Sequence, residues 1–334
     1  MDVKHRRIPS VTVGGVALPR LVLGHLPFVG ESYQGAARNR EYVTRFSHVE
    51  NTVTIVAKAV NEYGVTALAV DSAVESWLSR LLLDAVRTVG ATAWTELSLL
   101  PCFSIPLTLD GEALDDYRRW LTYYTVERRV RGDGLLAKYV RDPILRCRPG
   151  WATRFPEALT HSSPYREDEL ARLQLNYTKL DRALTAFKEF HLLFAQAGSE
   201  SDFLTMTGRH DILEAFVHFL AQELHCPVLL GLHHAGTSIP RLDAMDVGVV
   251  GYVTPVNSLG ALMLPSQHRA LKAIKASAKP VIAIKPLAGG RVAPRTAFDY
   301  VFNQVGVDAS MLGVASEQEV DEDFQLALMA LSGL

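Results

Sequence analysis

The sequence has few of the residues that would indicate a disulfide scaffold, a cysteine-bound metal or a membrane anchor. Among its 334 residues are three cysteines, which lie far apart and form no CxxC pair. This spacing argues against a disulfide framework and a cysteine-ligated zinc site, and it favours a reducing, cytoplasmic location. The apolar runs are shorter than a membrane span, and the first residues lack the apolar stretch of a signal peptide. We therefore expect no membrane association.

The chain also lacks an excess of charge of either sign. Lys and Arg total 34 and Asp and Glu total 36, which gives a formal net charge of -2. Without a strong positive field, binding to nucleic acid is not expected. The composition, with 48% hydrophobic and 21% charged residues, is typical of a globular protein with a substantial core. A small-molecule substrate is the expected partner, and the composition is compatible with a homo-oligomer.

Short β-rich apolar runs alternate with longer segments of helical periodicity, a pattern typical of parallel βα units. The predicted strands are 20–24, 67–72, 92–98, 202–207, 227–233, 247–254, 280–286 and 309–315. The predicted helices are 50–63, 74–89, 211–224, 237–245, 266–277, 294–304 and 317–332. Eight such units predict one α/β domain over residues 1–334, a (β/α)8 TIM barrel. A doubly wound sheet is the alternative, because the pattern does not reveal strand order.

The connection after the third predicted strand is far longer than the others. It spans about a hundred residues, against a few in an ordinary loop, and it contains helical patterns near 112–130 and 166–196. We interpret the second pattern as including the third barrel helix, and residues 100–165 as a helical insertion on the face of the strand ends. The insertion is rich in arginine and aromatic residues, a composition that suits either a lid over an anionic substrate or a subunit contact.

Polar and ionisable residues follow several predicted strands, at the ends where barrel enzymes carry their active sites. They are His25, Asp71, Glu96, Thr205, Thr207, His233, His234, Thr254, Asn257 and Lys285. A buried charge costs several kcal/mol unless it is paired, ligated or hydrated. These groups form either an internal polar network or a functional site, and their convergence from several strands favours the site.

Two adjacent histidines, His233 and His234, follow the fifth predicted strand. Neighbouring side chains on a strand point to opposite faces, so we expect one imidazole of the two to face the barrel interior. We expect this imidazole to lie within a few ångströms of the Glu96 or Asp71 carboxylate, directly or across a metal or water.

The seventh and eighth units suggest an anion site. The segments KPLAGGR and GVASEQE place small residues and free backbone N–H groups ahead of predicted helices, an arrangement by which barrels hold phosphate groups. The alternative interpretation is that the two glycines form an ordinary turn that binds no anion. The predicted substrate-binding residues are Thr207, Asn257, Gly289, Gly290, Arg291 and Ser316.

Several segments resemble the aldo-keto reductase family. VTVGGVALPRLVLG is similar to the N-terminal hairpin and first strand of that family, and GVTALAVDSA is similar to its second strand. KPVIAIKPLAGGR and VDASMLGVASEQEVDED resemble its seventh and eighth units. The resemblance implies a (β/α)8 barrel closed by a β-hairpin, and carbonyl reduction with a nicotinamide cofactor by a catalytic Asp, Tyr, Lys and His. It covers the two ends of the chain better than the middle.

The catalytic residues of that family are matched in part. Asp71 corresponds to the aspartate, whereas Ser76 stands at the tyrosine position, Glu96 at the lysine position and Thr207 at the histidine position. Residues 316–319 are largely acidic where the family binds the adenosine phosphate. These differences argue against NADP as a hydride donor, because a serine does not donate a proton as a phenol does.

The carboxylates and imidazoles in place of the tetrad favour a divalent metal, such as Zn, Mn or Fe. The predicted metal ligands are His25, Asp71, Glu96, His233 and His234, and the predicted catalytic residues are Asp71, Glu96, His234 and Lys285. The resulting hypothesis is an enzyme, a lyase, isomerase or hydrolase, that acts on a small polar, anionic substrate by metal-assisted or general acid/base chemistry. A site without metal would use Glu96 as base and a histidine as acid. The alternatives are a divergent NAD(P)-dependent reductase and a non-catalytic binding or regulatory barrel.

Overall fold

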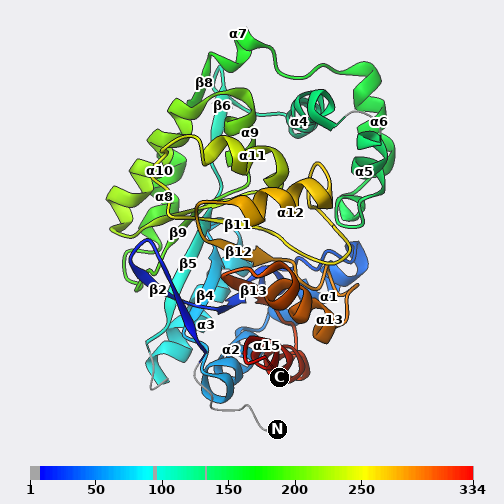
Figure 1. Ribbon diagram of the computed structural model, residues 1–334. Coiled ribbons are helices and arrows are strands. Elements are labelled where there is room, and N and C mark those ends of the chain that lie inside the picture. Colours follow the sequence, from blue (N-terminus) through cyan, green and yellow to red (C-terminus); the bar gives the residue numbers. More distant parts are fainter. Residues whose placement is uncertain (1–7, 93–95, 132–133, 334) are drawn as a thin grey trace.

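Eight parallel strands form a closed barrel (Figure 1). The computed structural model describes residues 8–92, 96–131 and 134–333. The barrel strands, in their order around the barrel, are β3 (Leu21–Gly24), β4 (Ala67–Asp71), β5 (Ser98–Phe103), β9 (Ala195–Ala197), β10 (Val228–Gly231), β11 (Gly251–Pro255), β12 (Val281–Ile284) and β13 (Ala309–Gly313). The last strand pairs with the first, which confirms the predicted (β/α)8 barrel and excludes the doubly wound sheet.

The predicted N-terminal hairpin is confirmed. It consists of the antiparallel strands β1 (Ser10–Val13) and β2 (Val16–Pro19). Its turn residues Gly14 and Gly15 have φ of 52° and 83°, the left-handed geometry that two-residue hairpin turns require. Val13 and Leu18 are fully buried in the same hydrophobic cluster as residues inside the barrel, so the hairpin closes one end of it.

Side chains of the barrel strands alternate between two cores, as the pleat of a strand requires. In β4, Ala67 and Ala69 belong to the cluster inside the barrel, whereas Leu68 and Val70 pack in the outer cluster between the strands and the helices. The small inward side chains leave room at the strand ends, where the polar groups lie.

Helices surround the barrel on its outer side (Figure 1). They are α1 (Ala36–Phe46), α2 (Val49–Tyr63), α3 (Trp77–Thr92), α8 (Tyr177–Thr185), α9 (Glu200–Thr207), α10 (His210–Leu224), α11 (Ala235–Leu242), α12 (Gln267–Ala276), α13 (Pro294–Asp299), α14 (Glu317–Glu319) and α15 (Gln325–Leu331). Shorter segments are the 3-10 helix η1 (Leu26–Val29) and the π-helical η3 (Tyr300–Val305) and η4 (Val320–Phe324). None of the helices in the described part of the chain is long and apolar enough to cross a membrane.

The predicted insertion after the third strand is present and forms one end of the molecule, in green at the top of Figure 1. Its elements are β6 (Leu107–Leu109), β7 (Glu112–Ala113), α4 (Asp116–Arg131), α5 (Leu135–Arg141), η2 (Leu145–Cys147), α6 (Trp151–His161), α7 (Glu167–Leu170) and β8 (Leu173–Leu175). The three strands form a small antiparallel sheet. The insertion starts later than residue 100, because β5 extends to Phe103.

The third barrel strand lies later than predicted. Residues 93–95 of the predicted strand 92–98 fall outside the described residues. Glu96 and Leu97 are in no regular element, and β5 begins at Ser98. The misleading residue is Pro101, since proline in a strand interior normally argues against a strand. Here it pairs with Val70 within the parallel ladder.

The prediction of a fourth strand at 202–207 is wrong. These residues belong to α9, and the fourth strand is the short β9, which has the sequence AQA. Residues 201–206 are buried without interruption, so their alternation of apolar and polar residues does not mark two faces of a strand. The strand itself has no β-branched or aromatic residue by which it could be identified.

Candidate active site

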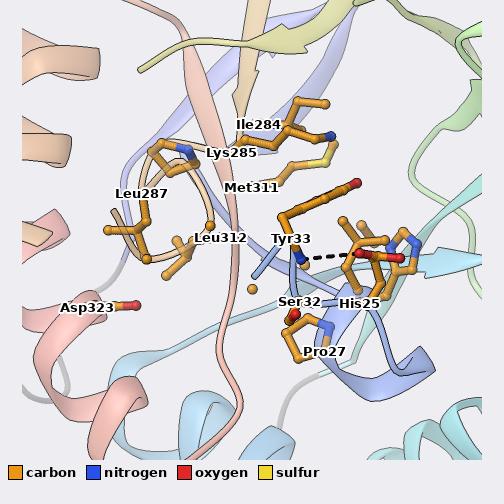
Figure 2. Close-up of a pocket in the computed structure, with 18 of the residues that line it drawn as sticks. His25, Pro27, Ser32, Tyr33, Ile284, Lys285, Leu287, Met311, Leu312 and Asp323 are labelled. Atoms are coloured by element: carbon orange, nitrogen blue, oxygen red, sulfur yellow. Dashed lines mark hydrogen bonds between the residues drawn. The ribbon is translucent and has the colours of Figure 1, made fainter. Parts of the chain in front are cut away.

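A cavity of about 460 Å³, here called the central cavity, lies at the carboxyl ends of the barrel strands. Six ionisable residues of its lining come from the loop after β3, from β5, from the loop after β10 and from the end of β12. These residues are His25, Glu31, Tyr33, Cys102, His233 and Lys285. Figure 2 shows His25, Tyr33 and Lys285 around one space, with Ile284 and Met311 among the apolar residues beside them.

Lys285 follows β12 directly and lies in the left-handed region, with φ of 57°. Non-glycine residues rarely adopt this conformation, and it tends to occur at functional sites. Its Nζ lies 4.7 Å from the centroid of the Tyr33 ring. Among the described residues, the Nζ atom makes no hydrogen bond and no ion pair, whereas the backbone carbonyl of Lys285 accepts from the N–H of Ala288 at 2.9 Å. Burial lowers the pKa of Lys285 to about 8, although Cys102 and Glu31 act in the opposite direction.

Tyr33 provides the aromatic face against this amine. It also has a positive φ, of 56°, and its position is fixed by backbone contacts: its N–H donates to Glu31 Oε1 (3.2 Å), and its carbonyl accepts from Cys147 Sγ (2.9 Å) and from Arg291 (2.8 Å). Burial, with Glu31 and Cys102, raises the pKa of the Tyr33 hydroxyl well above its usual range. The phenol is therefore neutral and able to donate a hydrogen bond.

His25 and Asp71 lie at the ends of adjacent strands. Burial lowers the pKa of His25 to about 4, which Asp71 partly offsets and Lys285 reinforces, so the imidazole is neutral at pH 7. Asp71 ends β4, and its Oδ2 accepts a hydrogen bond from Ser79 Oγ at 2.9 Å. The expectation that His25 and Lys285 lie at the barrel mouth is confirmed.

Cys102 is a site residue that the sequence reasoning missed. It lies in β5, in register with Asp71, and lines the central cavity. Burial raises the pKa of its thiol to about 12, and Asp71 and Glu200 contribute. The thiol is therefore protonated. The error in the third strand hid this residue, and Tyr33 was missed because it lies in a loop that has no periodic pattern.

Three predicted site residues, Glu96, Thr205 and Thr207, do not lie at the strand ends, and Thr205 lies within α9. Glu96 is exposed and precedes β5, so it is at the amino end of the strand, away from the central cavity. Thr207 ends α9, where its hydroxyl donates to the carbonyl of Phe203 at 2.7 Å. The placement of these three residues at strand ends was wrong, because the third and fourth strands were assigned to the wrong segments.

The two adjacent histidines have different environments. His234 is buried, and its Nδ1 lies 2.9 Å from Oε1 of Glu127, a residue of α4 in the insertion. His233 lines the central cavity. Both backbone N–H groups donate to the buried carboxylate of Asp202. The expected approach of an imidazole to Glu96 or Asp71 was wrong for His234, whose carboxylate partner comes from the insertion.

Glu127 makes a buried contact between the insertion and the barrel. Its carboxylate accepts from Tyr139 Oη (2.5 Å) and Thr237 Oγ1 (3.0 Å), as well as contacting His234. Burial disfavours the charged form of His234, but Glu127 and Asp202 outweigh it, and the pKa of His234 is raised. This pair holds α4 over the strand ends.

The predicted metal ligands do not converge. Within the residues that the structure describes, no group of three or more His, Cys, Asp or Glu side chains is arranged to hold a metal ion. Glu96 lies at the far end of its strand, and the Nδ1 of His234 is engaged with Glu127.

A second cavity, of about 410 Å³, lies between the insertion and the strand ends. It shares Glu31, Tyr33, Ser199 and His233 with the central cavity. Arg119 and Arg148 from the insertion also line it, so arginines do face the barrel mouth as a lid would require. The positive charges of both arginines are partly neutralised by carboxylates. Arg119 pairs with Glu200 (3.2 Å) and Asp116 (2.8 Å), and Arg148 also pairs with Asp116.

The predicted substrate-binding residues of the later loops make internal hydrogen bonds. Arg291 donates to the carbonyls of Tyr33, Ala288 and Pro143, and Ser316 caps α14 by accepting from the N–H of Glu319. The buried Asn257 exchanges two hydrogen bonds with the backbone of Ala261. Gly289 and Gly290 have positive φ and line the central cavity. A substrate contact at these residues remains a prediction.

The outer part of the central cavity is acidic. Glu319, Glu322 and Asp323 line it. Burial raises the pKa of Asp323 to about 7, and the two glutamates add to the effect. This edge repels an anionic group rather than attracting one.

Comparison with known proteins identifies the fold. No protein-family profile and no curated protein sequence matches the chain. Solved structures do match. A protein from Pseudomonas aeruginosa that has been assigned to the aldo-keto reductases has 15% identity and a TM-score of 0.54, covering 98% of each chain. The glycerol dehydrogenase of Gluconobacter oxydans has 10% identity and a TM-score of 0.52, covering 98% of this chain and 96% of the other.

A third match is an aldo-keto reductase of Bombyx mori in complex with NADP, with 10% identity and a TM-score of 0.50, covering 96% of this chain and 88% of the other. Similarity at such low identity establishes architecture but not activity. Together with the closed barrel and the N-terminal hairpin, these matches show that the chain has the barrel fold of the aldo-keto reductases.

Proposed function

We propose that the protein is an enzyme that acts on a small polar carbonyl compound in the central cavity by acid/base chemistry. The observation that carries this proposal is the amine of Lys285, which lies in the cavity beside the neutral phenol of Tyr33 with no carboxylate paired to it among the described residues. Perturbed ionisable groups in a cavity at the strand ends are typical of catalytic sites.

The groups around the cavity suit the activation of a carbonyl. Tyr33 can donate a hydrogen bond to the substrate oxygen, which stabilises the negative charge of an enolate. His25, which is neutral, and the unprotonated fraction of Lys285 are the bases that can accept a proton from the carbon next to the carbonyl. Lyases and isomerases of carbonyl compounds both use this step, so we favour these two classes over a hydrolase.

The second cavity would receive the remainder of the substrate. It shares the lining residues Tyr33 and His233 with the central cavity, and it is also lined by Arg119 and Arg148. An anionic group on the substrate would compete with Asp116 for these guanidinium groups. The metal-assisted form of the sequence-based hypothesis has less support, because its predicted ligands do not meet.

Reduction of a carbonyl with a nicotinamide cofactor is the second candidate. The contact between Tyr33 and Lys285, beside His25, provides the residue types that the aldo-keto reductase resemblance implies, although Tyr33 and Lys285 come from other segments of the chain. The structural matches also include reductases and a dehydrogenase, and one of the reductases is bound to NADP. The acidic edge of the central cavity weighs against the phosphate groups of that cofactor.

Proton exchange in D2O tests the proposal. The protein is incubated with pyruvate, 2-oxobutyrate, dihydroxyacetone or glyceraldehyde, and ¹H NMR follows the protons next to the carbonyl. We expect faster loss of this signal for at least one compound with the wild type, and a rate at the uncatalysed level with Lys285→Met. Lys272→Met, on the exposed side of α12, is the matched control and should retain the wild-type rate.

Parallel samples receive NADPH, and its absorbance is followed. Oxidation of NADPH with these compounds, without any catalysed proton exchange, would support the reductase and contradict the acid/base proposal. An equal rate for wild type and Lys285→Met would show that the central cavity is not the site of the reaction.

A further inference from the structure

We infer that Lys285 acts as a covalent catalyst, whose amine attacks the carbonyl carbon of the substrate and forms a Schiff base. This inference rests on the proposed function, because it specifies how the central cavity activates a carbonyl. It assigns the site a substrate class, small aldehydes and ketones, and it gives Lys285 a role that differs from that of a general base.

The position of Lys285 favours a reactive role over a structural one. A lysine that stabilises a barrel would pair with a carboxylate, since an unpaired buried ammonium is costly. In the described part of the chain, no carboxylate lies within ion-pair distance of Lys285 Nζ, and the ring of Tyr33 is its close contact. The amine is thus held in the cavity without a partner that would block attack on a ligand.

The backbone at Lys285 directs the side chain into the cavity. Its φ of 57° places it in the left-handed region directly after Ile284, the last residue of β12. Ala288, in the same loop, also has a positive φ, of 50°. Such conformations are unfavourable for residues other than glycine, and they persist where the surrounding structure fixes them. Figure 2 shows Lys285 and Tyr33 extending into the same space.

The protonation states of the cavity groups select the amine as the nucleophile. The pKa of Lys285, lowered to about 8 by burial, leaves an appreciable neutral fraction at neutral pH. The thiol of Cys102 is the other candidate, but burial raises its pKa to about 12, so it lacks the reactive thiolate. An amine with a lowered pKa in a partly apolar cavity is the known requirement for Schiff-base formation.

The reaction is balanced with the groups present. The nitrogen lone pair of Lys285 forms a bond to the carbonyl carbon, and the C=O π electrons move to oxygen. The oxygen then takes up a proton and the nitrogen gives one up, which leaves a neutral carbinolamine. Tyr33 and His25 are placed to supply and return protons. The hydroxyl group takes up a proton and leaves as water while the nitrogen lone pair forms the C=N bond. The product is the protonated imine, which accepts electrons when a bond at the neighbouring carbon breaks. Hydrolysis of the imine restores the amine, and no oxidant or reductant is needed.

Reduction by borohydride tests the covalent step. The protein is incubated with pyruvate, and separately with glyceraldehyde, and then treated with sodium borohydride. A Schiff base is converted to a stable secondary amine, so the protein mass increases by the mass of the probe less one oxygen atom. We expect peptide mapping to locate the modification on Lys285, and the modified fraction to exceed that of any surface lysine at least about tenfold.

Two variants separate nucleophilic attack from other roles. Lys285→Arg keeps the positive charge but cannot form an imine, so it should show no modification at this position and no proton exchange. Lys272→Met should be modified on Lys285 to the wild-type extent. Circular dichroism confirms that Lys285→Arg is folded, and Tyr33→Phe, which keeps the ring, should slow the modification without abolishing it.

The outcomes distinguish this inference from the proposed function. Catalysed proton exchange that depends on Lys285, without any trapped adduct, would overturn the Schiff base and leave an acid/base role for the residue. Modification spread evenly over surface lysines would overturn it as well. If neither exchange nor adduct occurs with any carbonyl probe, both the proposed function and the Schiff base are wrong.

Discussion

The burial of Lys285 affects the stability of the protein as well as its chemistry. The pKa falls from 10.5 to about 8 on folding, so the folded state disfavours the charged form. This burial lowers the free energy of unfolding by its full amount below pH 8, where the lysine is protonated in both the folded and the unfolded state. The effect decreases between pH 8 and pH 10.5, because the unfolded chain then binds more protons than the folded one.

We therefore expect Lys285→Met to raise the free energy of unfolding at pH 7 by roughly 3 kcal/mol, since one pKa unit corresponds to about 1.4 kcal/mol. The gain should shrink towards pH 10. Urea unfolding at the two pH values measures it, with Lys272→Met as the control that changes little. A loss of stability at pH 7 would show that the amine has a stabilising partner.

The adjacent histidines should separate into one structural and one functional residue. His234 is buried against Glu127, and removing one partner of a buried pair costs about 3–5 kcal/mol. Because the folded pKa of His234 is raised, its protonation adds stability below about pH 6.5 that is lost as pH rises through the folded value. His234→Ala should therefore lower the free energy of unfolding more at pH 5.5 than at pH 9.

His233 lines both cavities, and we expect His233→Ala to reduce proton exchange and borohydride trapping while changing stability little. Urea unfolding measures the stability of both variants, and the exchange assay measures their catalysis of proton exchange. If His233→Ala destabilises as much as His234→Ala does and leaves exchange unchanged, the assignment of the two roles is wrong.

Among the elements, the insertion is held to the barrel by buried polar contacts as well as by aromatic packing, such as that of Tyr123 against Phe203. One of the polar contacts is made by Asp142, whose side chain is fully buried. It accepts hydrogen bonds from the backbone N–H groups of Ile144, Leu145 and Leu262, and it pairs with Lys138 at 2.6 Å. The bond to Leu262 connects the insertion to the loop between β11 and α12.

Asp142→Ala should loosen the insertion before the barrel. The substitution leaves buried N–H groups without acceptors, each at a cost of about 1–3 kcal/mol. We expect faster amide hydrogen exchange in α4, α5 and α6, with the barrel strands protected as in the wild type. Asp110→Ala, which removes an exposed pair with Arg172, is the control and should change exchange little. Equal acceleration in the strands would mean that the insertion does not open separately.

At the scale of the whole molecule, the barrel is closed at one end by the hairpin and carries the cavities at the other. Leu18 of the hairpin is fully buried within the inner core. We expect Leu18→Ala to lower the global free energy of unfolding by about 2–5 kcal/mol, because it leaves a cavity in a packed interior. Val16→Ala, at a partly exposed position of the same strand, should cost less.

Borohydride trapping on Lys285 should be the same in the Leu18→Ala variant at temperatures where it remains folded, since the substitution lies at the opposite end of the barrel. A change in trapping would show that the hairpin influences the site. Urea unfolding and the trapping assay, on the same samples, measure both quantities.

The sequence alone determined the barrel, the hairpin, the insertion and the presence of Lys285 and His25 at the strand ends. Six of the eight strands could be placed because their apolar runs have a local pattern that turns and helices interrupt. Strands β5 and β9 could not be placed, since Pro101 obscures one and AQA carries no strand signal, and Glu96 and Thr207 were assigned to the site as a consequence.

Tertiary structure alone decided which groups meet. The pairing of His234 with Glu127, 107 residues apart, depends on how the insertion folds back over the barrel. The contact of Tyr33 with Lys285 likewise joins the first and seventh barrel units. No periodicity in a chain encodes such contacts, because side-chain spacing fixes the face of an element but not the partner that the fold brings to it. The pKa values that make the site reactive follow from the same burial and partners, and so they too exist only in the folded molecule.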